Sequence, residues 1–214
     1  MIGPFQLYLF DIDGTLLDSA HDICGAVQHV LSPHVNEPLP FEYLRSFVGF
    51  HLDAVFTEVL PHATREQLDD MIQLYKETYL GRKHASTRVF PGVVETLSAL
   101  GGRKSTATTK GTPTTRAVLE QFGLLQFFDH VQGTDGFPCK PAPDVIERSL
   151  AVLDARPEDC LFVGDSAADM EAGRRAGVQI CAVNYGYGTP EALAEWKPDY
   201  RISDLRELLP EGHF

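Results

Sequence analysis

The chain has 214 residues, 43% of them hydrophobic, so a packed core is expected and disorder is not. Lysine and arginine number 18 and aspartate and glutamate 30, and the net charge of −12 argues against nucleic acid or an anionic membrane as the main partner. No apolar run approaches the ~20 residues that span a bilayer, and no signal-peptide pattern or zinc spacing of the four cysteines is seen. These features predict a cytoplasmic protein.

A short acidic sequence follows the first apolar run of the chain. Residues 7–10 are typical of a buried strand, and Asp11 and Asp13 come directly after it. Side chains two apart in a strand point to the same side, and Gly14 lets the backbone turn and leaves amides free to meet an anion. An Asp-Gly turn is the simpler alternative, but it does not explain the charge at Asp11. Paired acids beside open amides favour a divalent cation and a phosphate.

Residues 18–82 contain three stretches with the hydrophobic periodicity of amphipathic helices, at 23–31, 52–60 and 68–79. Asp18 or Ser19 is expected to cap the first helix, and Thr64 the last. Because this stretch has no convincing strand, it predicts a small helical bundle.

After residue 90, helical patterns alternate with short apolar strands at 161–163 and 180–183. This alternation predicts a parallel sheet with helices on both faces, provided that the polar segment 104–109 is also a strand. The first strand must join the same sheet, so the helical block is an insertion above the carboxyl ends of the strands, where ligands bind. We therefore expect an α/β core at 1–17 and 86–214, and a helical lid at 18–85.

Three further segments carry matching chemistry. Thr108 ends the polar strand and offers a hydroxyl to a phosphate oxygen, while two prolines stiffen the chain around Lys140. Asp165 ends an apolar strand, and Asp169 follows four residues later. Carboxylates gathered near Asp11 would repel one another unless a cation lies among them, and oxygen ligands suit Mg²⁺.

These motifs, in this order, resemble the haloacid dehalogenase-like superfamily, in its branch of phosphatases with a helical cap. Residues 11–15 are close to the first family motif; Thr108 lies in the second, Lys140 in the third, and Asp165 with Asp169 in the fourth. The resemblance covers essentially the whole chain and is strongest to phosphoglycolate phosphatases. It implies a Rossmann-like α/β core with an inserted all-helical cap. Relatives usually have Asn at the position of Thr109.

The resemblance also implies roles for individual residues. Asp11 would attack phosphorus to form an aspartyl-phosphate, and Asp13 would act as general acid and then general base. Asp11, Asp165 and the carbonyl oxygen of Asp13 would hold Mg²⁺, whereas Asp169 would bind a metal water or orient Lys140. The groups expected to contact the phosphoryl group or the substrate are Ile12, Gly14, Thr108, Thr109 and Lys140.

Substrate choice is expected to lie in the helical insertion. Residues 45–51 form a polar, glycine-containing turn between two predicted helices, where Arg45 could pair with a substrate carboxylate or simply be solvated. The expected substrate is a small phosphorylated metabolite, and the protein a monomer or homodimer. A phosphosugar mutase, a pyrophosphatase and a catalytically silent metabolite-binding regulator remain alternatives.

Overall fold

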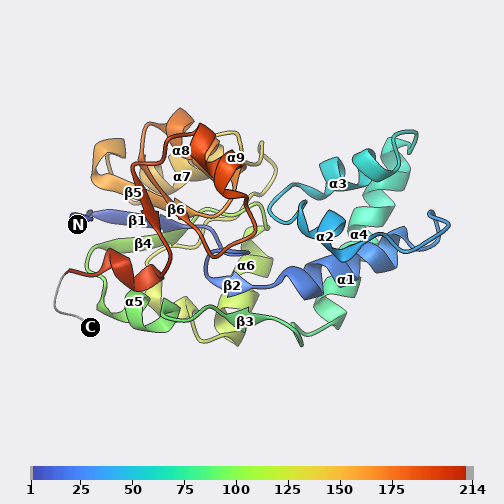
Figure 1. Cartoon of the computed structure of the whole chain (residues 1–214), viewed down its shortest axis with the longest axis horizontal. Coiled ribbons are helices and arrows are strands. Elements are labelled where there is room, and N and C mark those ends of the chain that lie inside the picture. Colours follow the sequence, from blue (N-terminus) through green and yellow to red (C-terminus); the bar gives the residue numbers. More distant parts are fainter. Residues whose placement is uncertain (1, 211–214) are drawn as a thin grey trace.

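The computed structural model describes residues 2–210 and has a sheet-containing unit beside a helical unit (Figure 1). A five-stranded sheet has the strand order β4-β1-β5-β6-β7, and all of its neighbouring strands pair in parallel. This arrangement confirms the predicted α/β fold. The strands are β1 (Leu7–Phe10), β4 (Arg103–Thr106), β5 (Cys160–Gly164), β6 (Gln179–Val183) and β7 (Tyr200–Ile202).

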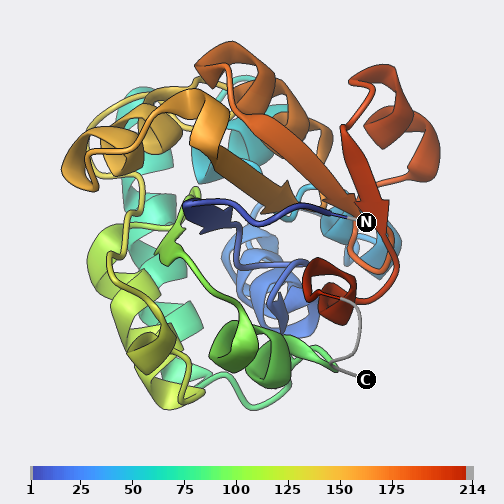
Figure 2. The same cartoon turned by 90° about the vertical axis from the view of Figure 1, so that its left-hand side faces the viewer.

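Helices cover both faces of the sheet because its central strands are apolar on both sides (Figure 2). Tyr8 and Phe10 face one hydrophobic cluster, and Leu7 and Leu9 face the other. The first cluster lies under α5 (Val93–Ala99), α6 (Thr112–Gln121) and the 3-10 helix η3 (Leu205–Leu208). The second lies under α7 (Asp144–Val152), α8 (Ala167–Ala176) and α9 (Pro190–Glu195). Two further 3-10 turns are η1 (Leu125–Phe127) and η2 (Pro157–Asp159).

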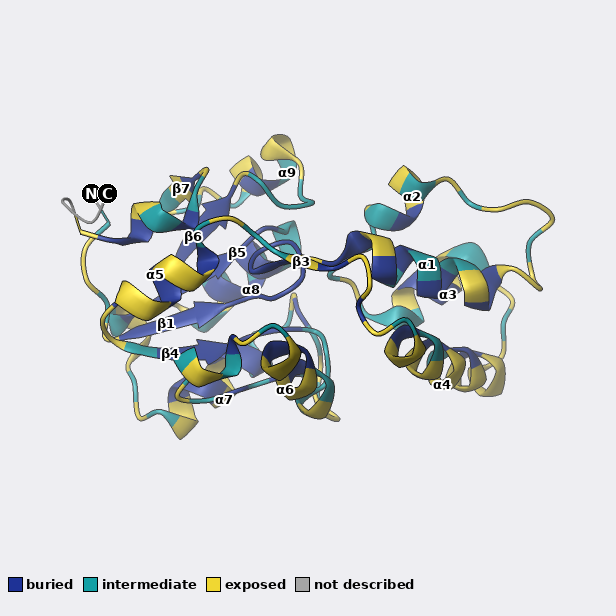
Figure 3. Ribbon diagram, turned by 90° about the horizontal axis from the view of Figure 1, so that it is seen from below, coloured by how far each residue is buried: buried dark blue, intermediate teal, exposed yellow. Residues whose placement is uncertain are grey.

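The helical unit has a hydrophobic cluster of its own (Figure 3). It consists of α1 (Ala20–Leu31), α2 (Phe41–Arg45), α3 (Leu52–Val59) and α4 (Arg65–Gly81). As predicted, Thr64 caps the last of these helices, in a capping box with Gln67. None of the helices within residues 2–210 is long and apolar enough to cross a membrane.

Two short antiparallel strands, β2 (Leu17–Asp18) and β3 (Arg88–Val89), carry the chain out to the helical unit and back. Figure 1 shows this ribbon between the two units. We propose that the helical unit, approximately residues 18–85, is a separate domain inserted into the α/β core at this ribbon.

Three local predictions differ from the structure. The polar strand is Arg103–Thr106 and ends before Thr108; its hydroxyl groups are buried because they bond to protein, as Thr106 Oγ1 does by donating to the Gln132 carbonyl at 2.9 Å. Helix α2 occupies the start of the segment expected to be a turn. Ser19 is at the N-cap position of α1, but its hydroxyl donates to Asp13 Oδ1 instead of capping the helix.

Candidate active site

The acidic residues meet at the carboxyl-terminal edge of the sheet. Asp11 directly follows β1, and Asp165 directly follows the neighbouring strand β5. Asp169 lies in the first turn of α8, whose N-cap is Ser166, so the helix begins after Asp165 and does not include it. One carboxylate oxygen from each of the three aspartates lies within 4.8 Å of the others, and all three residues are buried.

Lys140 joins two of these carboxylates. Its Nζ donates to Asp11 Oδ1 at 2.7 Å, to Asp169 Oδ1 at 2.5 Å and to the Ala107 carbonyl at 2.9 Å, which uses all three ammonium protons. The other oxygen of Asp169, Oδ2, accepts from the Ser166 amide at 2.9 Å and the Ser166 hydroxyl at 2.7 Å. Asp169 therefore contacts Lys140 directly through one oxygen, while Ser166 holds the other.

Asp165 is held from two sides. Its Oδ1 accepts from Thr15 Oγ1 at 3.3 Å, and its Oδ2 accepts from the Tyr187 amide at 2.7 Å. Glycines allow the backbone to approach it: a Cβ on Gly14, which has φ of 96°, or on Gly186 would collide with this carboxylate. The turn also engages the amide of Gly14, which donates to the Leu17 carbonyl at 2.8 Å. Among the amides that we expected to be free near Ile12 to Gly14, that of Gly14 is therefore engaged within the turn.

The pKa values of Asp11 and Asp165 are raised above their usual range. Burial raises the pKa of Asp11 to about 7, and the nearby Lys140 lowers it only partly. Burial, followed by the charges of Asp169 and Asp11, raises the pKa of Asp165 well above its usual value. One lysine thus faces three buried carboxylates. A site with excess negative charge and carboxylate oxygens as donors fits a hard divalent cation such as Mg²⁺.

Asp13 is paired with a lysine that the sequence analysis did not single out. Its Oδ1 accepts from Ser19 Oγ at 2.6 Å, and its Oδ2 lies 3.3 Å from Lys110 Nζ. That ammonium also donates to Tyr79 Oη at 3.3 Å and lies 4.4 Å from the centre of the Tyr79 ring. Burial lowers the pKa of Lys110, but Asp13, Tyr79 and Tyr75 together raise it by more, so the group stays charged.

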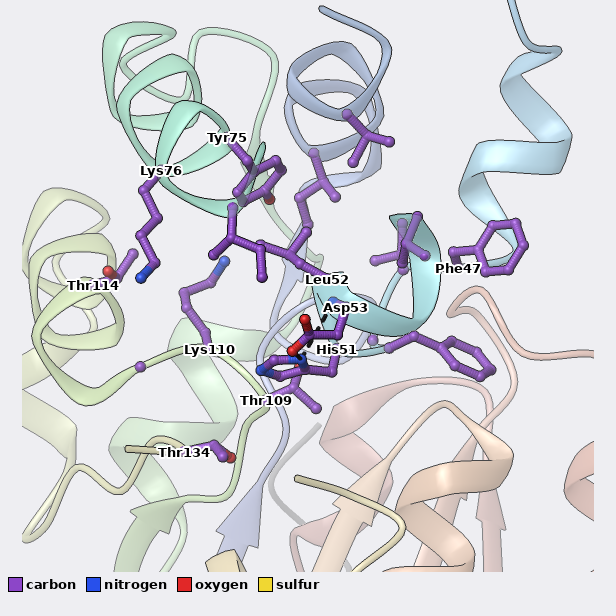
Figure 4. A pocket seen from close by; sticks show the side chains of 18 of the residues that line it. Phe47, His51, Leu52, Asp53, Tyr75, Lys76, Thr109, Lys110, Thr114 and Thr134 are labelled. Atoms are coloured by element: carbon purple, nitrogen blue, oxygen red, sulfur yellow. Dashed lines mark hydrogen bonds and ion pairs between the residues drawn. The ribbon is translucent and has the colours of Figure 1, made fainter. Parts of the chain in front are cut away.

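A cavity of about 480 Å³ lies between the two units. Asp13, Thr109 and Lys110 line it from the sheet unit, and His51 and Tyr75 are among the residues that line it from the helical unit. In Figure 4, the side chain of Lys110 extends from its loop toward Tyr75. Through Asp13, the acidic site therefore adjoins a partly open cavity of the size of a small molecule.

The remaining predicted residues fall into two groups. Thr108 is buried after β4, with its hydroxyl oxygen 3.3 Å from the Lys110 amide, and Ile12 is buried between Asp11 and Asp13. Arg45 lies apart: it donates to Glu42 Oε2 at 3.0 Å, covers the Tyr187 ring and lines a separate cavity of about 240 Å³. Within the predicted turn 45–51, the residues that do line the larger cavity are Phe47, Val48, Gly49, Phe50 and His51.

The sequence and the fold have close counterparts. The model of the haloacid dehalogenase-like hydrolase family matches residues 8–183. Phosphoglycolate phosphatase 1 of Pseudomonas aeruginosa is 34% identical over 96% of this chain and 79% of its own length. Phosphoglycolate phosphatase of Aquifex aeolicus is 31% identical over 95% of both chains. A haloacid dehalogenase-like family hydrolase from Streptococcus pneumoniae superposes with a TM-score of 0.85 at 26% identity, over 95% of this chain and 96% of that chain.

Proposed function

We propose that this chain, which belongs to the haloacid dehalogenase-like hydrolase family, is a magnesium-dependent phosphatase of small phosphomonoesters and that 2-phosphoglycolate represents its substrate class. The observation that carries this proposal is the position of Lys140, whose ammonium lies between Asp11 and Asp169 at the edge that also presents Asp165. The names of the two bacterial relatives support the choice of substrate.

The residues of the site have distinct tasks in this reaction. Asp11 attacks phosphorus and forms an aspartyl-phosphate as the alcohol leaves. Asp13 gives a proton to the leaving oxygen and later takes one from the attacking water. Lys140 holds the Asp11 carboxylate in position. Its positive charge and the Thr108 hydroxyl stabilise the negative charge of the phosphoryl oxygens. Asp11, Asp165 and the Asp13 carbonyl would hold Mg²⁺, whose positive charge would offset the repulsion between carboxylate and phosphate.

The helical unit serves in this proposal as a cap. It forms one wall of the cavity that adjoins Asp13, so a small substrate between the two units is shielded from bulk water. Shielding matters because an aspartyl-phosphate must survive until one water is positioned beside Asp13.

The test uses Asp11→Asn, which keeps the shape of the side chain but removes the nucleophile. We expect no release of inorganic phosphate from 2-phosphoglycolate or p-nitrophenyl phosphate, even with excess Mg²⁺, and we expect EDTA to inactivate the wild type. Asp70→Asn, an exposed change on α4, is the matched control and should keep wild-type turnover. Full activity in Asp11→Asn would exclude the aspartyl route, and transfer of phosphate to a sugar without release would indicate a mutase.

A further inference from the structure

We propose that Lys110 binds a second anionic group of the substrate, a carboxylate attached on the leaving-group side of the ester. This inference rests on the proposed phosphatase function and assigns the carboxylate to the loop after β4 in the sheet unit, instead of to Arg45 in the helical unit. The substrates so recognised are phosphate esters of small hydroxy acids.

The first argument is position. Asp13 is the residue assigned to the leaving oxygen, and the ammonium of Lys110 lies 3.3 Å from its Oδ2. A carboxylate one carbon beyond the ester oxygen therefore comes within reach of this ammonium. Lys110 also lines the cavity that adjoins Asp13, and Figure 4 shows its side chain extending into that space.

The second argument is the number of carboxylates that already pair with the other basic side chains around the cavity. Arg65 pairs with two, Asp53 at 2.8 Å and also Asp69. Lys110 lies at ion-pair distance from one carboxylate among the described residues, that of Asp13, so it is less fully neutralised than Arg65.

Burial distinguishes Lys110 from the remaining cation of the cavity wall. Lys76 is an exposed residue of α4, whereas only 11% of the Lys110 side chain is accessible to solvent. An ion pair formed at a buried ammonium is screened less than one formed at the surface. Lys110 is therefore the cation of this wall at which a carboxylate would contribute most to affinity.

The third argument is preorganisation. The ammonium of Lys110 donates to Tyr79 Oη and lies over the Tyr79 ring, which stacks on Tyr75 with ring centres 5.6 Å apart. These contacts fix the side chain before substrate arrives, so little conformational entropy is lost on binding.

The acidic side chains that also line the cavity already have partners within the protein. Asp53 and Asp69 pair with Arg65, and Asp135 accepts from the Thr112 amide at 3.0 Å.

The competing interpretation is that Lys110 only positions Asp13. The two roles differ in kinetics. A lysine that acts only through Asp13 affects every phosphomonoester and lowers kcat, whereas a lysine that binds the substrate carboxylate also raises KM selectively for substrates that carry one. The comparison of 2-phosphoglycolate with ethyl phosphate separates the roles, because a methyl group replaces the carboxylate.

The experiment measures kcat and KM for both esters with the wild type, Lys110→Met, Lys76→Met and Arg45→Met. We expect the wild type to prefer 2-phosphoglycolate and Lys110→Met to lose about 10- to 100-fold of that preference, the effect of one charged hydrogen bond. Lys76→Met and Arg45→Met should retain the preference. Lys110→Gln, which keeps a donor for Tyr79, replaces Lys110→Met if circular dichroism shows that the latter is unfolded.

The proposal is overturned if the wild type hydrolyses the two esters equally well, if Lys110→Met keeps the preference, or if Arg45→Met removes it. Any of these results leaves the phosphatase function intact. A wild type that releases phosphate from no phosphomonoester overturns the phosphatase function as well, so the two failures are distinguishable.

Discussion

A buried carboxylate in α1 ties this helix to the segment between α4 and β3, and its removal tests the structure directly. Asp22 is fully buried in α1. Its Oδ1 accepts from Arg82 Nε at 3.1 Å, and its Oδ2 accepts from the Ser86 amide at 2.9 Å and Thr87 Oγ1 at 2.8 Å. Asp22→Asn keeps the volume of the side chain. It replaces one carboxylate oxygen with an NH₂ group, which cannot accept from the donors that this oxygen faced.

The size of the effect follows from these contacts. Asparagine can still accept through its one oxygen, so the Ser86 and Thr87 donors remain satisfied while the ion pair with Arg82 is lost. Hydrogen bonds to charged groups contribute about 1.5–3 kcal/mol, so we expect the free energy of unfolding to fall by about 2 kcal/mol at neutral pH. For a chain of this length, that corresponds to a Tm lower by about 4–8 °C.

The effect depends on pH with a definite sign. Burial alone raises the pKa of Asp22, but the bonds from Thr87 and Ser86 and the charge of Arg82 outweigh it and hold the pKa below its usual value. The folded state therefore gains stability above the unfolded pKa of about 4, and it loses this gain as pH falls through the folded pKa.

The assay is urea unfolding of the wild type and Asp22→Asn, monitored by circular dichroism, at a series of pH values from about 7 down to about 3.5. The stability gap should be constant near neutral pH and shrink at the acidic end. Asp69→Asn, which removes an exposed partner of Arg65, is the control and should cause little change at any pH. A gap that is absent at pH 7, or that does not shrink in acid, would refute the reasoning.

Three further predictions concern the site. Lys140→Met leaves Asp11 and Asp169 buried without their cation, so the free energy of unfolding measured in EDTA should fall by about 3 kcal/mol or more, and an unchanged value would contradict the ion-pair geometry. Tyr187→Phe removes the hydroxyl that accepts from the amides of Ser19 and Ala20 at the start of α1, at 2.7 and 3.0 Å; unfolding measurements should show a loss of about 1 kcal/mol, the size of a missing helix cap. Asp13→Asn should slow ethyl phosphate far more than p-nitrophenyl phosphate, and equal losses would argue against an acid role.

Much of the sheet unit was predictable because its signals are local. Apolar runs marked β1, β5 and β6, and in a parallel sheet the residues that follow adjacent strands share an edge. This geometry brought Asp11 and Asp165 together, as the sequence indicated. The sequence analysis did not predict α2, α9 or β7, which are three to six residues long and carry too few apolar positions to show a period.

The polar partners of the site were not predictable, because each depends on chain segments that are distant in sequence. Lys110 meets Asp13 only when the sheet unit has folded, and it meets Tyr79 only once the helical unit has packed onto the sheet unit. The backbone amide of Tyr187 reaches Asp165 from 22 residues away, while its hydroxyl reaches Ser19, the N-cap residue of α1, from 168 residues away. For Arg45 the sequence left two alternatives open, a substrate carboxylate or solvent, and in the structure its guanidinium contacts Glu42 and Tyr187.

The ribbon formed by β2 and β3 limits how substrate enters and product leaves. Leu17 pairs with Val89 and Asp18 with Arg88, so the two covalent links to the helical unit are bonded to each other instead of moving independently. A paired ribbon bends more readily than it shears, since shear would break its ladder. We therefore expect the helical unit to swing mainly about one axis, and a swing that widens the entrance would also carry Tyr75 and Tyr79 away from Lys110.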